Sequence, residues 1–179
     1  GSGLRGGRDP VSLPVRFPMT EQLSEGALQV RLSLSDPSAA AELFSCAASD
    51  FLHAIYFSKS ADTEERVSQI VFGLAALFEE KSGIVELPAG FTIAGAAKRL
   101  RPFLSKRLNA MEPEDRAIFE DDAAVVTLAV NAFFEELLVR ADAWLELKGG
   151  VMNEEALHEF LASSVIHDWM LGWAKRIIG

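Results

Sequence analysis

Residues 121–150 read DDAAVVTLAVNAFFEELLVRADAWLELKGG, and this stretch decides the fold of the chain. Its large apolar residues recur at spacings of three and four, which is the periodicity of one helix face. They are Val126, Val130, Phe133, Leu137, Ala141 and Trp144. A second apolar face carries Val125, Leu128, Ala132 and Val139. Since a helix with two apolar faces is covered by several neighbours, we predict a long central helix around Phe133 that ends at Gly149–Gly150.

The segments on either side of this stretch predict further helices. Residues that favour helix N-termini stand before each of them. The expected helices cover about 37–57, 63–83, 92–109, a short segment after Glu112, and 154–178. Pro102 lies inside the third of these segments, so we expect a kink or a break near Leu100–Arg101.

One segment has the pattern of a strand. In residues 27–34, leucine and valine alternate with polar residues, which is typical of a half-buried strand. A lone strand must pair, and residues 84–87 are a possible mate. We therefore predict an all-α or mainly α fold: a single-domain bundle of five or six helices around a long central helix, with at most one short β element near 27–34.

The first 18 residues differ from the rest, because they contain three prolines and no apolar periodicity. We predict that residues 1–18 are an appended leader or a disordered segment and that residues 19–179 form a single helical domain. The whole chain has a net charge of −9. Without 1–18, 14 basic residues face 25 acidic ones, a net charge of −11. So acidic a domain is not expected to bind nucleic acid through its overall charge.

The cysteine count and the hydropathy of the sequence indicate in which cellular compartment the protein is expected. Cys46 is the single cysteine, so no disulfide can form within the chain. No apolar run of a signal peptide follows Met19, and no stretch of 18 apolar residues predicts a membrane span. These features favour an intracellular, cytoplasmic protein, with the nucleus as the open alternative.

Cys46, Asp50 and His53 are the residue types of a Cys-His nucleophilic site. These residues share one helix face, but Cys46 and His53 would lie about 10 Å apart along the helix. A nucleophile and its base must lie within about 3 Å. We therefore expect no catalytic residues, no cofactor and no enzyme activity, and interpret Cys46 as a buried thiol.

Two acid-x-x-His pairs, Asp50 with His53 and Glu155 with His158, offer the only metal-like spacing. Carboxylate-x-x-His pairs on two helices resemble the di-iron site of ferritin-like bundles. That site also takes a carboxylate from each of two further helices, and no isolated carboxylate stands inside another apolar stripe. We expect no metal and keep a helical carboxylate/His metal site as an alternative.

One segment is strongly basic in this acidic chain. It carries Lys98, Arg99, Arg101, Lys106 and Arg107. Acidic residues crowd the segment 112–122 that follows, so the two segments can neutralise each other within the fold or across a dimer. The alternative is a contact with an anion or an acidic partner.

The C-terminal helix is crowded with large apolar residues, among them Trp169, Met170, Trp173 and Ile177. Such residues are favoured at protein interfaces, although a buried helix end would have the same composition. From these four residues we predict a non-enzymatic, adaptor or regulatory helical module that binds another protein, as a homo- or hetero-oligomer. A helical ligand-binding or sensor domain is the alternative, with the 12 Phe and three Trp around an apolar cavity.

The order of elements after Thr92 also resembles a known family. A shorter helix, a long helix that ends at Gly149–Gly150, and a further helix after Asn153 resemble the order of the histone fold. The resemblance implies a scaffold that forms heterodimers. Pro102, the acidic insertion at 112–122 and the length of the last helix depart from that family.

Overall fold

Seven α-helices and one short strand pair make up the part of the chain that this computed structural model describes, residues 32–58, 61–79 and 85–179. In chain order the elements are β1 (Leu32–Ser33), α2 (Pro37–Tyr56), α3 (Thr63–Ala76), the 3-10 turn η1 (Leu77–Glu79), β2 (Val85–Glu86), α4 (Ile93–Asn109), α5 (Pro113–Ile118), α6 (Asp122–Lys148), α7 (Glu154–Ala162) and α8 (Ser164–Ile178). The predicted mainly helical class is confirmed.

The long helix α6 begins and ends where the sequence predicts. The Asp121 carboxylate accepts a hydrogen bond from the Ala124 amide at 3.2 Å, which caps the N-terminus. At the other end, Gly149 has a φ of 105°, a left-handed conformation that glycine adopts without strain. Because both ends are fixed by local chemistry, the boundaries of this helix could be predicted without tertiary information.

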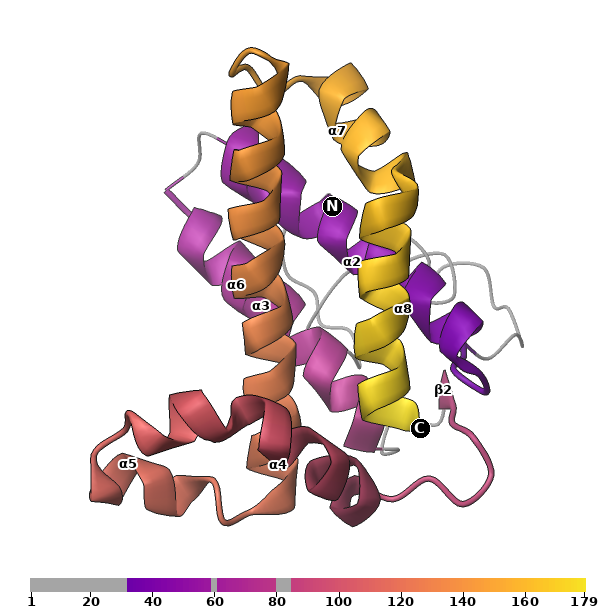
Figure 1. Cartoon of the computed structure of the whole chain (residues 1–179), viewed down its shortest axis with the longest axis vertical. Coiled ribbons are helices and arrows are strands. Elements are labelled where there is room, and N and C mark those ends of the chain that lie inside the picture. Colours follow the sequence, from indigo (N-terminus) through magenta and orange to yellow (C-terminus); the bar gives the residue numbers. More distant parts are fainter. Residues whose placement is uncertain (1–31, 59–60, 80–84) are drawn as a thin grey trace.

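Helix α6 is central, as expected. Its backbone packs against α2, α3 and α4, while α8 packs against α2, α4 and α7. In Figure 1, α6 and α8 stand in front, α2 and α3 cross behind them, and α4 and α5 form the lower end. Phe133 of α6 is buried and lies 5.2 Å from Phe44 of α2 and 4.9 Å from Trp169 of α8, measured between ring centroids. Aromatic side chains therefore join the elements of the core.

The predicted β element is present as a two-stranded parallel pair. Leu32 pairs with Val85 and Ser33 with Glu86, and the Leu34 amide donates to the Glu86 carbonyl at 2.7 Å. The expected mate at 84–87 is therefore correct. The part of the predicted strand before residue 32 lies outside the described residues, as does the predicted boundary at residue 18.

The predicted C-terminal helix is two helices, which raises the number above the expected five or six. Ser163 has a φ of −63° and a ψ of 137°, an extended conformation that separates α7 from α8. Ser163 and Ser164 favour helix N-termini, but neither Gly nor Pro stands at this point and the Ser163 side chain makes no capping hydrogen bond, so the local signal for the break is weak. The two helices can then pack in different directions, with Leu157 and Phe160 of α7 buried independently of α8.

The break that we expected near Leu100–Arg101 is absent, because α4 continues through Pro102. Pro102 is exposed, and so is Lys98 four residues earlier. The carbonyl that loses its helical partner to the proline therefore lies on the side of the helix that water can reach.

Among the described residues, no helix is both long and apolar enough to cross a membrane.

The resemblance to the histone fold is limited to helix order. Helix α5 stands between α4 and the long helix, and residues 149–153 contain no strand.

The large aromatic side chains of the core contact one another. The ring centroid of Phe44 lies 6.2 Å from that of Phe78 and 5.2 Å from that of Phe133. These side chains therefore pack together in the core between α2, η1 and α6.

Candidate functional site: a basic face on α4 and α8

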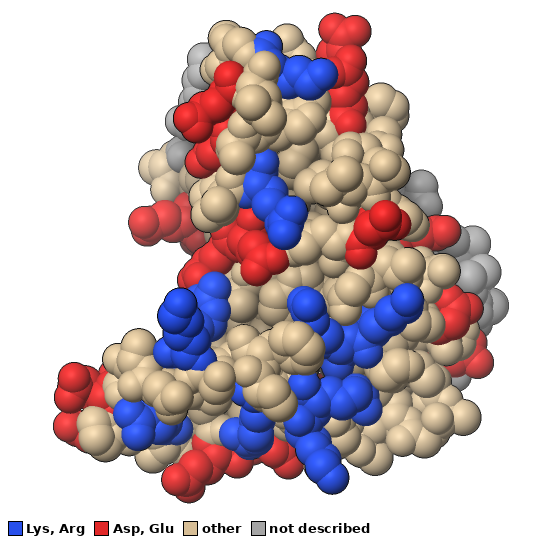
Figure 2. Space-filling view, viewed as in Figure 1, with Lys and Arg blue, Asp and Glu red and all other residues tan. Residues whose placement is uncertain are grey.

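Helix α4 concentrates positive charge in an acidic chain. It carries five Lys and Arg residues and no Asp or Glu, whereas the chain as a whole has a net charge of −9. The last turn of α8, which packs against α4, adds Lys175 and Arg176. Figure 2 shows Lys and Arg gathered across the lower part of one face of the molecule, over α4 and toward the end of α8.

Arg99 joins the two helices. Its Nε donates to the Arg176 carbonyl at 3.1 Å, and its Nη2 donates to the Ile177 carbonyl at 2.6 Å. The last carbonyls of a helix lack partners within the helix and form the negative end of its dipole. Arg99 therefore stabilises the end of α8, and among the described residues no carboxylate neutralises its charge.

Arg101 lies on the opposite flank of α4. Its guanidinium donates to the Phe119 carbonyl at 2.8 Å and to Asp122 Oδ1 at 3.0 Å. This is the contact predicted between the basic segment and the acidic segment after it. Arg116 of α5 is also held by backbone, since its Nε donates to the Leu108 carbonyl at 3.0 Å. These two arginines therefore have structural roles.

Arg107 pairs with α6 and not with the acidic segment 112–122. Its Nη1 donates to Glu135 Oε1 at 2.6 Å. The two side chains are 39% and 54% exposed. Exposed ion pairs contribute only about 0–1 kcal/mol, so a carboxylate from another molecule could replace Glu135 at little cost.

Phe103 stands among these cations with more than half of its surface, 56%, exposed. One turn of α4 separates it from Arg99 on one side and from Arg107 on the other. The guanidinium carbon of Arg176 lies 4.2 Å from the centroid of the Phe103 ring. Three lysines, Lys98, Lys106 and Lys175, are exposed and have no ion pair in the described part of the chain.

We call this surface the basic face and define it by Lys98, Arg99, Phe103, Lys106, Arg107, Lys175 and Arg176. The sequence predicts the α4 cations of this surface but does not predict Phe103, Lys175 or Arg176. Phe103 has a local signal, since it lies four residues from both Arg99 and Arg107. The sequence contains no local signal for Lys175 and Arg176, because their place on this surface depends on the packing of α8 against α4, which is far away in the sequence.

The predicted partner surface at the C-terminal helix is wrong for three of its four residues. Met170, Trp173 and Ile177 are 1%, 4% and 0% exposed. They lie on the face of α8 that is covered by its packing against α2 and α4. The crowding of apolar residues at this helix end is therefore explained by burial on more than one side.

Trp169 is the fourth residue and is half-buried. Its ring stacks on Phe133 with an interplanar angle of 11°, and its Nε1 donates to a Glu136 carboxylate oxygen. The Arg140 guanidinium carbon lies 5.1 Å from its ring centroid. Trp169 therefore joins α8 to α6 and has partners for both its ring and its N–H group.

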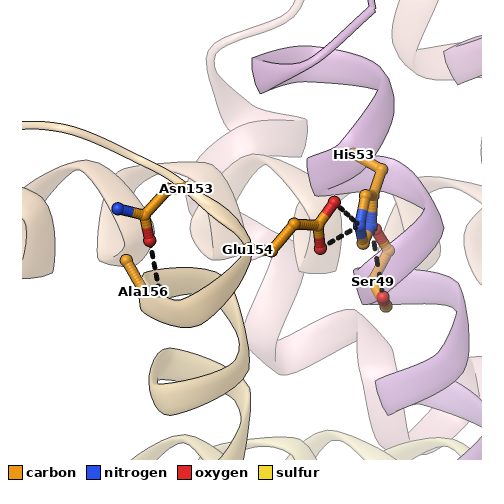
Figure 3. A network of polar contacts seen from close by, with 5 residues as sticks. All are labelled: Ser49, His53, Asn153, Glu154 and Ala156. Carbon is orange, nitrogen blue, oxygen red and sulfur yellow. Dashed lines mark hydrogen bonds and ion pairs between the residues drawn. The ribbon is translucent and has the colours of Figure 1, made fainter.

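The structure does not assemble the metal candidates Asp50, His53, Glu155 and His158. Among the described residues, no three His, Cys, Asp or Glu side chains are grouped as a metal site requires. His53 contacts Glu154, with Nε2 2.9 Å from Oε1, and its Nδ1 lies 2.7 Å from the Ser49 carbonyl (Figure 3). Glu155 and His158 are both exposed.

Cys46 is half-buried, so the prediction of a buried thiol is only partly right. Both ring nitrogens of His53 lie against other groups, so this imidazole is not placed to act as a base for the thiol. Burial raises the pKa of the Cys46 thiol, and the negative charges of Asp50 and Glu42 raise it further. A thiol with a raised pKa is a poor nucleophile near neutral pH.

No protein-family model matches the chain, and neither does any curated protein or solved structure with which it was compared. The function must therefore be argued from the chemistry of the basic face.

Proposed function

We propose that this chain is a non-enzymatic protein-interaction module whose basic face binds an acidic segment of a partner protein. One observation carries the proposal: an exposed aromatic ring, Phe103, lies among cations most of which have no carboxylate partner in the described part of the chain. We place the interaction in the cytoplasm, because the single cysteine allows no disulfide within the chain.

Contacts within the fold account for only some of the cations on α4 and the last turn of α8. Arg101 binds the acidic segment, and Arg99 stabilises the end of α8. Three lysines form no ion pair within the described part of the chain: Lys98, Lys106 and Lys175. Clustered like charges repel one another, so an arrangement of this kind is favoured when an anionic partner is present.

The size of the basic face suits a short segment. Arg99 and Arg107 are separated by eight helical steps, or roughly 12 Å at about 1.5 Å per residue. An extended peptide advances about 3.3 Å per residue, so roughly four or five residues would cover this distance. A short acidic segment could contact Arg99, Lys106 and Arg107, which lie within about 100° of one another around the axis of α4.

The surrounding charge favours a protein segment over nucleic acid. Carboxylates border the basic face, among them Glu135 beside Arg107 and Asp122 beside Arg101. Charges act over about 8 Å at physiological salt, so a nucleic acid that extends beyond the face would meet this acidic border. Figure 2 shows Asp and Glu above the basic residues and at the lower left edge of the same face.

A charge-reversal pair tests the proposal. Lys106→Glu with Lys175→Glu changes two exposed cations of the basic face, whereas Arg66→Glu with Lys148→Glu makes the same change in net charge elsewhere. The three chains are used to capture proteins from a lysate of the source cell, and each captured protein is then purified and its Kd measured. We expect a partner that binds the wild type and the control but binds the Lys106/Lys175 variant at least tenfold more weakly.

Salt provides the second criterion. Raising the salt concentration from about 0.1 M to about 1 M shortens the screening length from about 10 Å to about 3 Å, so binding through this face should be largely lost. Equal binding of all three chains by every partner, or binding that resists salt, would contradict the proposal.

A further inference from the structure

We infer that Phe103 and Arg176 form the specificity-determining anchor of the basic face, and that the partner segment carries a large apolar side chain, aromatic by preference, flanked by carboxylates. This inference rests on the proposed function and names the chemistry of its ligand. Lysines alone would accept any acidic segment, whereas an aromatic ring at the centre selects among such segments.

Arg176 is held in place by two aromatic rings. Its guanidinium carbon lies 4.2 Å from the ring centroid of Phe103 and 5.2 Å from the ring of Trp173. Trp173 is buried and fixed by the core, since its ring lies 6.3 Å from Phe133. A planar guanidinium that is stacked in this way keeps its N–H groups at its edge, where they can donate to a carboxylate. Because the side chain is already ordered, binding costs little further conformational entropy.

The rest of the Phe103 ring is available to a ligand. Arg176 covers part of the ring, yet 56% of the residue is exposed. An apolar side chain that packs there would bury ring surface and would lie beside cations on both sides. Arg99 stands one turn before Phe103, and Lys106 and Arg107 stand one turn after it. The matching ligand is therefore an apolar residue with acidic residues before and after it.

Two blocked synthetic peptides test this match. The first is Glu-Asp-Phe-Asp-Glu and the second is Glu-Asp-Ala-Asp-Glu, so they have equal charge and differ in one side chain. Binding to the full-length ¹⁵N-labelled chain is followed at low salt by NMR chemical shifts. We expect both peptides to shift amides of α4 and of the last turn of α8. The phenylalanine peptide should bind about three- to tenfold more tightly, the range expected for one aromatic pair.

Variants of the chain identify the anchor. Phe103→Ala should bind the two peptides equally, and Phe103→Tyr should retain the preference. Arg176→Lys keeps the charge but loses the planar stack, so the preference should fall while the salt dependence stays. Val165→Ala alters an apolar residue of α8 that is also more than half exposed, and it should change nothing. All variants should keep the melting temperature of the wild type within a few degrees, because the Phe103 and Arg176 side chains lie at the surface.

The possible failures can be told apart. If the wild type binds both peptides equally at the basic face, the anchor is refuted and the proposed function stands. If neither peptide shifts α4 or α8, both proposals fail. If a short DNA duplex or vesicles that contain anionic lipid bind this face more tightly than the phenylalanine peptide, the partner is not an acidic protein segment.

Discussion

Replacing Trp173 with alanine should lower the free energy of unfolding by about 3–5 kcal/mol. The side chain is 4% exposed and lies edge-on to Phe133, with ring centroids 6.3 Å apart. Its removal leaves a cavity between α8 and the core that neighbouring side chains cannot fill. Since domains are stable by only about 5–15 kcal/mol in total, such a loss should lower the melting temperature by roughly 6–20 °C.

The phenylalanine variant at the same position should behave differently. Trp173 Nε1 is buried and finds no hydrogen-bond partner among the described residues, and a buried donor without a partner costs about 1–3 kcal/mol. Trp173→Phe removes that donor and keeps much of the ring, so it should cost less than half of what alanine costs. Urea unfolding followed by circular dichroism measures both changes, with Val165→Ala as an exposed control on α8. A loss below about 1 kcal/mol for Trp173→Ala would refute the burial of this helix end.

Two further predictions concern groups that titrate. The pKa of Tyr56, the single tyrosine, is raised by burial and by its hydrogen bond to Asp142, so its phenolate absorbance should be weak one unit above the ordinary pKa of about 10 and should increase in Asp142→Asn. Because the fold favours the neutral phenol, this contribution to stability is complete below about pH 10 and is lost as the pH rises further. The half-buried Cys46 thiol has a raised pKa, which predicts slow reaction with a thiol reagent near pH 7 and faster reaction in urea; equal rates would contradict the raised pKa.

Much of the fold could be predicted because its signals are local. Asp36 caps α2, Thr92 caps α4 and Asn153 caps α7, each through a hydrogen bond to an amide three residues later. The break at Ser163 has only a weak local signal, the Ser163–Ser164 pair, because the Ser163 side chain makes no capping hydrogen bond. What separates α7 from α8 is packing: Phe160 lies 5.8 Å from Trp144 of α6, while Trp173 lies against Phe133.

The candidate site could be predicted only in part, for the same reason. The cations of α4 are visible in the sequence as a cluster. Whether each is neutralised depends on tertiary contacts, as the pairs Arg101–Asp122 and Arg107–Glu135 show. For Trp173 the sequence does not decide between exposure and burial, because an apolar residue near a helix end can lie at a partner surface or in the core. The structure moves the candidate surface from the apolar face of α8 to its basic last turn.

Hydrogen exchange tests the central claim most directly. The exchange rates of the full chain are measured alone and in complex with the partner that depends on Lys106 and Lys175. We predict that protection on binding is concentrated in α4 and the last turn of α8, and that it disappears at about 1 M salt. Protection confined to other elements, such as α3 or the C-terminal half of α6, would show that the basic face is not the binding surface.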